Sequence, residues 1–204
     1  MSNIVDLRRD GDVAVVTVDN PPVNALKHAV RAGLNDALSR ARDDAATRAI
    51  VLVSAGRTFI AGADITEFSK PPQPPSLPDV IGLIENIAKP VIAAVHGTPL
   101  GGGLELTLAC HFRIAAPGTR LGLPEIKLGL IPGAGGTQRL PRLIGIDKAM
   151  AMILAGDPIP AKEALANGLI DEIVEGDLTA AAIAFARRVL GEKRPLRRVR
   201  DMET

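Results

Sequence analysis

Two glutamates of this 204-residue chain, Glu105 and Glu125, sit in apolar, glycine-rich surroundings where a carboxylate is unusual. Glu105 lies in LGGGLEL (100–106), and Glu125 follows Pro124 in GLPEIKLGL (122–130). Burial raises the pKa of a carboxyl group, and a nearby second carboxylate raises the pKa of one of the two further. Such a pair can divide general acid–base catalysis at neutral pH, one donating and one accepting a proton. The sequence alone does not establish that the two side chains meet.

Three consecutive glycines, residues 101–103, precede a segment that reads as a helix over 102–110. Glycines at a helix start leave the first-turn N–H groups accessible, and these groups carry the positive end of the helix dipole. They can hold an oxygen that becomes anionic during a reaction. The alternative is a tight turn followed by a solvated first-turn acid, Glu105.

A third glycine-containing stretch, TFIAGADITEF (58–68), follows a predicted strand. The side chains of residues 61–63 are too small to block a ligand, so a backbone N–H there can act as a second donor. The alternative is a turn in which Asp64 caps the next short helix.

The hydrophobic pattern predicts alternating strands and helices, which is typical of the α/β class. Strands are predicted at 13–19, 49–54, 91–95, 112–116 and 169–174, and the longer helices at 27–43, 80–88, 102–110 and 178–191. Short helices are expected between residues 135 and 168, ending at Gly145, Gly156 and Gly168. The proline-rich stretch 69–78 is expected to be an exposed loop or a mobile lid.

The composition excludes several classes of protein. The net charge is +1, so no overall field favours nucleic acid or a membrane surface, and Trp and Tyr are absent. No apolar run is long enough to span a membrane, and none at the N-terminus resembles a signal peptide. The one cysteine, Cys110, excludes an internal disulfide, and no Cys/His set has zinc-ligand spacing. No dinucleotide or phosphate-loop glycine motif occurs. A cytoplasmic protein without a metal is expected.

The three stretches, in this order, resemble the enoyl-CoA hydratase/isomerase (crotonase) superfamily. The resemblance covers nearly the whole chain and is strongest in FIAGADI, in KPVIAAVHGTPLGGGLELTLACHFRIA and in LGLPEIKLGLIPGAGGTQRLPRLIG. It implies a crotonase-like spiral of β-β-α units, with two roughly perpendicular sheets surrounded by helices.

The resemblance also implies a role for each residue of the site. The backbone N–H groups of Ala63 and Gly102 match the oxyanion hole for a thioester carbonyl, and Glu105 and Glu125 match the catalytic acids. These two hold a water, one taking its proton as the water adds to C3, and Glu125 is expected to deliver the proton to C2. The remaining matches are to substrate-binding positions, with Ala61 and Ile65 lining the pocket for the CoA adenine and the N–H of Gly133 helping to hold the site.

Glutamate at both catalytic positions favours hydration of a trans-2-enoyl-CoA to a 3-hydroxyacyl-CoA, as in fatty-acid β-oxidation. The alternatives are a 3-enoyl to 2-enoyl-CoA isomerase, which needs the same enolate, and a non-catalytic CoA-thioester-binding or RNA-binding module. No cofactor is implied, because CoA is part of the substrate. NAD would enter only with a dehydrogenase domain in a longer chain.

The domain expectation is a hydratase/isomerase domain over 1–192 and a basic linker or truncated tail over 193–204. The ending resembles the amino-terminal part of a multifunctional fatty-acid oxidation enzyme, in which an NAD-dependent 3-hydroxyacyl-CoA dehydrogenase follows. Covalent fusion to such a domain, or a homo-oligomer, is therefore expected.

The remaining reactive side chains are interpreted as structural. The family chemistry assigns no role to His96 or His111. Cys110 and His111 are adjacent on a predicted helix and do not face each other, so a nucleophile pair is not expected. Cys110 is interpreted as a buried core thiol.

Overall fold

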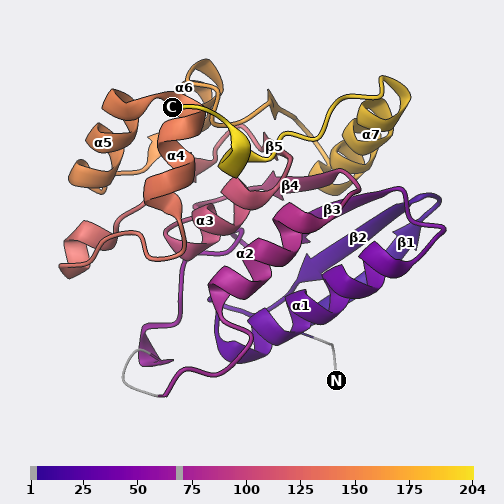
Figure 1. The fold of residues 1–204 in the computed structure, drawn as a ribbon, viewed down its shortest axis with the longest axis horizontal. Helices are drawn as coiled ribbons and strands as arrows, with labels where there is room; N and C mark the ends of the chain where they lie inside the picture. The colour runs from indigo at the N-terminus through magenta and orange to yellow at the C-terminus, as the bar shows by residue number, and fades with distance from the viewer. Residues whose placement is uncertain (1–3, 68–70) are drawn as a thin grey trace.

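The computed structural model describes residues 4–67 and 71–204, apart from the side chain of Ile65. A six-stranded sheet in the order β1-β2-β3-β4-β5-β8 forms its centre (Figure 1). β1 and β2 are antiparallel, and the other neighbours in this sheet are parallel. The strands are β1 (Val5–Asp10), β2 (Val13–Val18), β3 (Ala49–Ser54), β4 (Val91–Val95), β5 (Phe112–Ala115) and β8 (Glu172–Ile173).

The central strands form because β-branched and small apolar residues pack against helices on both faces of the sheet. Successive side chains of a strand point to opposite faces. In β2, Ala14, Val16 and Val18 therefore join one hydrophobic cluster, while Val13 and Val15 join another.

The first cluster lies under the helices α1 (His28–Asp43), α2 (Leu77–Asn86) and α3 (Gly102–Ala109) (Figure 1). The second lies between the opposite face and α7 (Leu178–Gly191), where Phe112 of β5 packs edge-on against Phe185 of α7, 5.8 Å apart between ring centres. The sheet is therefore covered on both faces.

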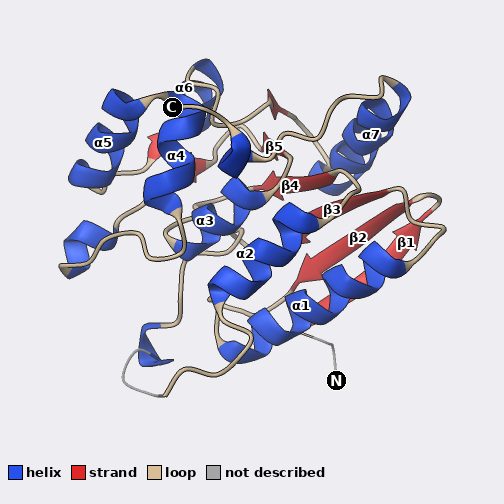
Figure 2. Cartoon of the chain, in the orientation of Figure 1, coloured by secondary structure: helices blue, strands red, loops and turns tan. Residues whose placement is uncertain are grey.

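Shorter elements follow β5 and build out one side of the molecule (Figure 2). The strands β6 (Arg120–Leu121) and β7 (Ile159–Pro160) form a second, two-stranded antiparallel sheet. The remaining helices are α4 (Gly136–Ile144), α5 (Ile146–Ala155) and α6 (Ala161–Ala166), with the 3-10 turns η1 (Ile65–Glu67), η2 (Glu125–Leu128) and η3 (Val199–Asp201).

The predicted α/β class is confirmed, and the predicted strands at 49–54 and 91–95 match β3 and β4 to the residue. Helix α2 begins earlier than the predicted 80, because Ser76 and Asp79 form a capping box at its N-terminus. The last strand is shorter than the predicted 169–174. β1 was not predicted, since its sequence VDLRRD is mostly charged and its side chains are largely exposed.

The end of the chain packs onto the domain rather than extending from it. Val199 is fully buried, and η3 contacts α3 and α4, as the yellow turn in Figure 1 shows. The basic composition of residues 193–204 did not predict this packing. The packing depends on the apolar side chain of Val199 and on arginines of this segment that form ion pairs with acids earlier in the chain. The domain boundary at residue 192 stays a prediction.

Candidate active site

A cavity of about 670 Å³ opens between the start of α3, η2 and the loop before α4. Both predicted acids line it, as do the two predicted oxyanion-hole residues. Its walls are otherwise mostly apolar, and the residues that line it are Ala61, Gly62, Ala63, Leu77, Pro78, Leu100, Gly101, Gly102, Glu105, Pro124, Glu125, Leu128, Leu130, Ile131, Gly133 and Ala134. Few polar groups converging in an apolar cavity are typical of a small-molecule site.

The start of α3 is pressed against residues 60–63. A methyl group added to Gly103 would lie 1.9 Å from the carbonyl oxygen of Ile60, so only glycine allows this approach. A methyl group on Gly102 would lie 3.7 Å from the nitrogen of Ala63. The backbone N–H groups of Ala63 and Gly102 are therefore neighbours, and neither has a backbone acceptor within the part of the chain that is described. Two neighbouring N–H donors without acceptors make Ala63 and Gly102 candidates for an oxyanion hole.

Glu105 lies in the first turn of α3 and is only 3% exposed. Its Oε1 accepts hydrogen bonds from the backbone N–H of Ala134, at 2.7 Å, and of Gly136, at 2.8 Å. Burial raises the pKa of this carboxyl, while the two N–H donors and the charge of Arg139 oppose the rise. Among the described residues Oε2 has no such partner, which leaves it able to accept a hydrogen bond from a bound molecule.

Glu125 is the first residue of η2 and half-buried. Its Oε2 is buried without a hydrogen-bond partner among the described residues. Burial raises the pKa of this carboxyl, and the negative charge of Glu105 raises it further. Gly101 makes room for the side chain, because a methyl group there would lie 3.0 Å from Glu125 Oε1.

The substrate-binding residues expected from the sequence are partly placed. Ala61 and Gly133 line the same cavity as the two acids. Ile65 begins η1, but its side chain is outside what the structure describes, so its predicted contact with an adenine stays a prediction. Asp64 accepts hydrogen bonds from the N–H and the hydroxyl of Thr66, which agrees with the helix-capping alternative.

The side chains interpreted as structural lie outside the cavity. His111 is buried, accepts a hydrogen bond from the N–H of Val91 at 3.0 Å, and has its pKa lowered to about 4, chiefly by burial. His96 Nε2 lies 3.0 Å from the carbonyl oxygen of Gly56. Burial raises the pKa of Cys110 to about 12, so its thiol is protonated at neutral pH.

The sequence reasoning missed the backbone donors to Glu105 and most of the apolar wall. The glycine cluster at 133–136 was recognised, but nothing in the spacing indicated that its N–H groups reach back to Glu105. Leu77, Leu130 and Ile131 were not singled out, although Ile131 is 76% exposed, which is a usable signal only once the fold is known.

Comparison with known proteins identifies the family of the chain. The family model described as Enoyl-CoA hydratase/isomerase matches residues 8–201. The chain belongs to this family. It is 49% identical over 200 residues to a probable enoyl-CoA hydratase of Bacillus subtilis, covering 91% of this chain and 77% of that protein. It is 45% identical over 192 residues to the peroxisomal bifunctional enzyme of Danio rerio.

Solved structures of the enoyl-CoA hydratase/isomerase family confirm the expected crotonase fold. An enoyl-CoA hydratase from Bacillus anthracis superposes with a TM-score of 0.85 at 37% identity, covering 92% of this chain and 76% of that one. The match to the Danio rerio enzyme covers 94% of this chain but only 27% of that protein, so the chain spans about a quarter of that relative's length.

The described residues include neither a membrane-spanning helix nor a metal-binding cluster. No helix there is long and apolar enough to cross a membrane. No cluster of three or more His, Cys, Asp or Glu side chains there could hold a metal ion.

Proposed function

We propose that this chain is an enzyme that hydrates trans-2-enoyl-CoA thioesters to 3-hydroxyacyl-CoA. The observation that carries the proposal is the meeting of four groups in one cavity: the carboxylates of Glu105 and Glu125 and the backbone N–H groups of Ala63 and Gly102. The names of the relatives support the same reaction, since the Bacillus subtilis protein is called a probable enoyl-CoA hydratase.

The thioester carbonyl would accept hydrogen bonds from Ala63 and Gly102. Negative charge grows on this oxygen as the enolate forms, and one such donor is worth about 3–4 kcal/mol in a transition state. The N–H of Gly102 belongs to the first turn of α3, so the helix dipole adds to the stabilisation.

Water addition would divide between the two acids. Glu105, whose ionised form is favoured by two N–H donors, accepts a proton from water as the oxygen bonds to C3. Glu125, whose raised pKa favours the protonated form, gives its proton to C2. The water contributes its OH to C3 and its proton to Glu105, while Glu125 gives its own proton to C2. Return of the proton from Glu105 to Glu125 then restores both acids, so the net reaction adds one water to the double bond.

The apolar wall of the cavity suits an acyl chain, and a neighbouring cavity beyond Ala63 would take the rest of the CoA. Leu77, Leu130 and Ile131 supply apolar surface for the acyl group. Ala63 also lines a neighbouring cavity of about 570 Å³ that includes Asp64 and Arg31. We assign the pantetheine and nucleotide of CoA to this neighbouring cavity, with no further cofactor.

The metabolic role, the partner and the location of the chain are also proposals. The Cucumis sativus relative is named a glyoxysomal fatty acid β-oxidation multifunctional protein, and this chain covers 28% of it. That similarity supports a role in β-oxidation and fits a fusion to further domains. The NAD-dependent 3-hydroxyacyl-CoA dehydrogenase domain, or a second copy of this chain, as partner is the expectation from the sequence. The cytoplasmic location expected from the sequence stays a prediction, since this relative's name places it in an organelle.

Loss of the enoyl-thioester absorbance on mixing the chain with crotonyl-CoA tests the reaction. Glu125→Gln, which keeps the shape of the side chain, should reduce the rate by about 10²–10⁴-fold. Turnover of a 3-enoyl-CoA in preference to crotonyl-CoA would identify an isomerase instead. A folded chain that turns over neither thioester but binds CoA esters or RNA would overturn the proposal in favour of a binding module.

A further inference from the structure

The loop 133–136, whose N–H groups donate to Glu105, also accepts a hydrogen bond from Arg139 of α4. Arg139 Nη1 donates a hydrogen bond of 3.1 Å to the carbonyl oxygen of Ala134. The N–H of the same residue, Ala134, donates to Glu105 Oε1 at 2.7 Å. A shift of this residue that lengthens one hydrogen bond therefore disturbs the other.

Arg139 lies directly against the loop at Gly135. A methyl group added to Gly135 would lie 1.9 Å from Arg139 Nη1, and the backbone of Gly135 has a φ of +98°, which favours glycine. The guanidinium therefore occupies the space that any other side chain at position 135 would need.

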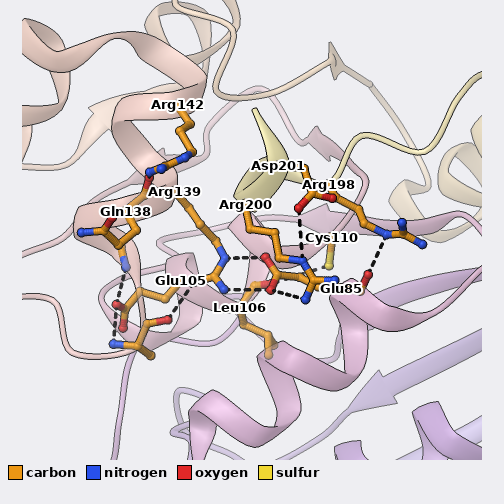
Figure 3. Close-up of polar contacts among 12 residues, drawn as sticks. Glu85, Glu105, Leu106, Cys110, Gln138, Arg139, Arg142, Arg198, Arg200 and Asp201 are labelled. Atoms are coloured by element: carbon orange, nitrogen blue, oxygen red, sulfur yellow. Dashed lines mark hydrogen bonds and ion pairs between the residues drawn. The ribbon is translucent and has the colours of Figure 1, made fainter. Parts of the chain in front are cut away.

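Arg139 is oriented in turn by a buried carboxylate on α2. Its Nε and Nη2 donate to the two oxygens of Glu85, at 2.7 and 2.9 Å, and Glu85 is 2% exposed (Figure 3). Two parallel charge-assisted hydrogen bonds, here called the fork, fix the plane of a guanidinium far better than a single contact does. Lysine cannot reproduce this fork.

Glu85 is held by the end of the chain as well. Arg198 Nε donates to the backbone oxygen of Glu85 at 3.0 Å, and Arg200 Nη1 lies 3.5 Å from Glu85 Oε2. Figure 3 shows these arginines approaching Glu85 beside Arg139. The carboxylate thus has partners from α4 and from the segment around η3.

We propose that Glu85 and Arg139 are positioning residues that set the position of Glu105 through Ala134. The inference rests on the proposed function for its effect on rate. Arg139 is not among the residues that line the cavity of the two acids, so it acts on the reaction through Glu105 and the loop that holds it. Without the fork, the loop 133–136 relaxes and the two N–H donors no longer hold Glu105 Oε1.

Two variants remove different parts of this arrangement. Arg139→Lys keeps the positive charge and loses the fork, and Glu85→Gln keeps the shape of the acid and loses its charge. We expect kcat for crotonyl-CoA to fall by about 10²-fold in Arg139→Lys, the loss typical of a misplacement of about 1 Å, with KM changed by less than about 3-fold. We expect a smaller loss of kcat in Glu85→Gln, because the amide oxygen of Gln still accepts one hydrogen bond from Arg139.

A carboxyl ¹³C NMR titration of Glu105, assigned with Glu105→Gln, tests the positioning without any turnover. Loss of the N–H donors should shift the titration of Glu105 to higher pH in Arg139→Lys, although the positive charge is retained. Arg197→Lys is the matched control, because Arg197 pairs with Asp171 away from the loop and the substitution likewise keeps the charge. It should leave both kcat and the titration of Glu105 unchanged.

The outcomes separate the two claims. If the wild type turns over no enoyl-CoA, the proposed function fails, and the titration alone decides the positioning. If Arg139→Lys is folded, keeps kcat within about 2-fold and titrates Glu105 like the wild type, the positioning role is wrong. If Arg139→Lys does not fold, the same two measurements on Glu85→Gln decide, and unchanged values there overturn the proposal.

Discussion

Glu105 and Glu125 line one cavity, but their carboxylates are held in opposite ways. Glu105 Oε1 accepts two backbone N–H donors, whereas Glu125 Oε2 is buried without a hydrogen-bond partner among the described residues. Burial raises the pKa of both carboxyls. Two N–H donors and the charge of Arg139 oppose the rise in Glu105. In Glu125 only its own backbone N–H opposes the rise, and the charge of Glu105 adds to it. This asymmetry suits Glu105 to accept a proton and Glu125 to give one.

The coupling between the two acids predicts a pH effect. In Glu105→Gln the pKa of Glu125 should fall, because the negative charge that disfavours its ionisation is gone. In the wild type, kcat/KM should first increase with rising pH, as Glu105 loses its proton. It should decrease at higher pH, as Glu125 loses its proton. Carboxyl ¹³C titrations of Glu125 in both proteins measure the first effect, and an unchanged titration in Glu105→Gln would contradict it.

The proposed oxyanion hole predicts that catalysis depends on the backbone N–H of Ala63. Replacing Ala63 by lactic acid turns its amide into an ester and removes the N–H while keeping the methyl group. We expect kcat/KM for crotonyl-CoA to fall by about 10²–10³-fold. The matched control is the same amide-to-ester change at Gly118, an exposed position away from the cavity, which should have little effect. A loss of equal size at both positions would indicate damage from the ester itself.

Much of this site could be predicted from the sequence, because its chemistry is carried by glycines and acids at recognisable positions. The run 101–103 indicated an accessible helix start, and the structure places Gly102 beside Ala63 there. For Glu105 the sequence left open a buried acid or a solvated first-turn acid, and the structure shows the buried one, 3% exposed. Local composition was sufficient for the accessible helix start, whereas the pairing of Gly102 with Ala63 was implied only by the family resemblance.

The contacts between distant segments could not be predicted. Ala134 and Gly136 donate to Glu105 from about thirty residues away, and backbone N–H groups carry no sequence signal. The Glu85–Arg139 pair joins residues 54 apart in the chain. An acid within the apolar run VIGLIENIA was the one available sign that Glu85 needs a buried partner. Likewise β1 was missed because only its pairing with β2, not its composition, makes it a strand.

The close approach of α3 to residue 60 predicts a large effect of one methyl group. In Gly103→Ala the new carbon would lie 1.9 Å from the Ile60 carbonyl oxygen, and both partners are backbone, so neither can rotate away. We expect a loss of about 1–3 kcal/mol or more in the free energy of unfolding, measured by urea denaturation. Gly118→Ala, which meets nothing within 4 Å, is the control. Equal stabilities of the two variants would rule out the close contact.

The environment of Cys110 predicts an unreactive thiol. Burial raises its pKa to about 12, so at pH 8 almost none is the thiolate that reacts with disulfide reagents. In the native protein 5,5′-dithiobis(2-nitrobenzoate) should label no thiol over minutes, while in 6–8 M urea it should label one per chain. Rapid labelling of the native chain would show that Cys110 is reached by solvent and would contradict the core position.

The raised pKa of Glu125 predicts that this acid reduces stability at neutral pH. Because the folded state holds its proton more tightly than the unfolded state, stability from this group is present below the unfolded pKa, about 4.3, and is lost as pH rises through the folded pKa. Glu125→Gln cannot ionise, so its melting temperature should exceed that of the wild type at pH 7.5, by on the order of 1 °C for a half-buried side chain. The difference should shrink as the pH falls toward 4.5, whereas Glu203→Gln, at an exposed position, should show none. A melting difference that is the same at both pH values would assign the effect to packing rather than to charge.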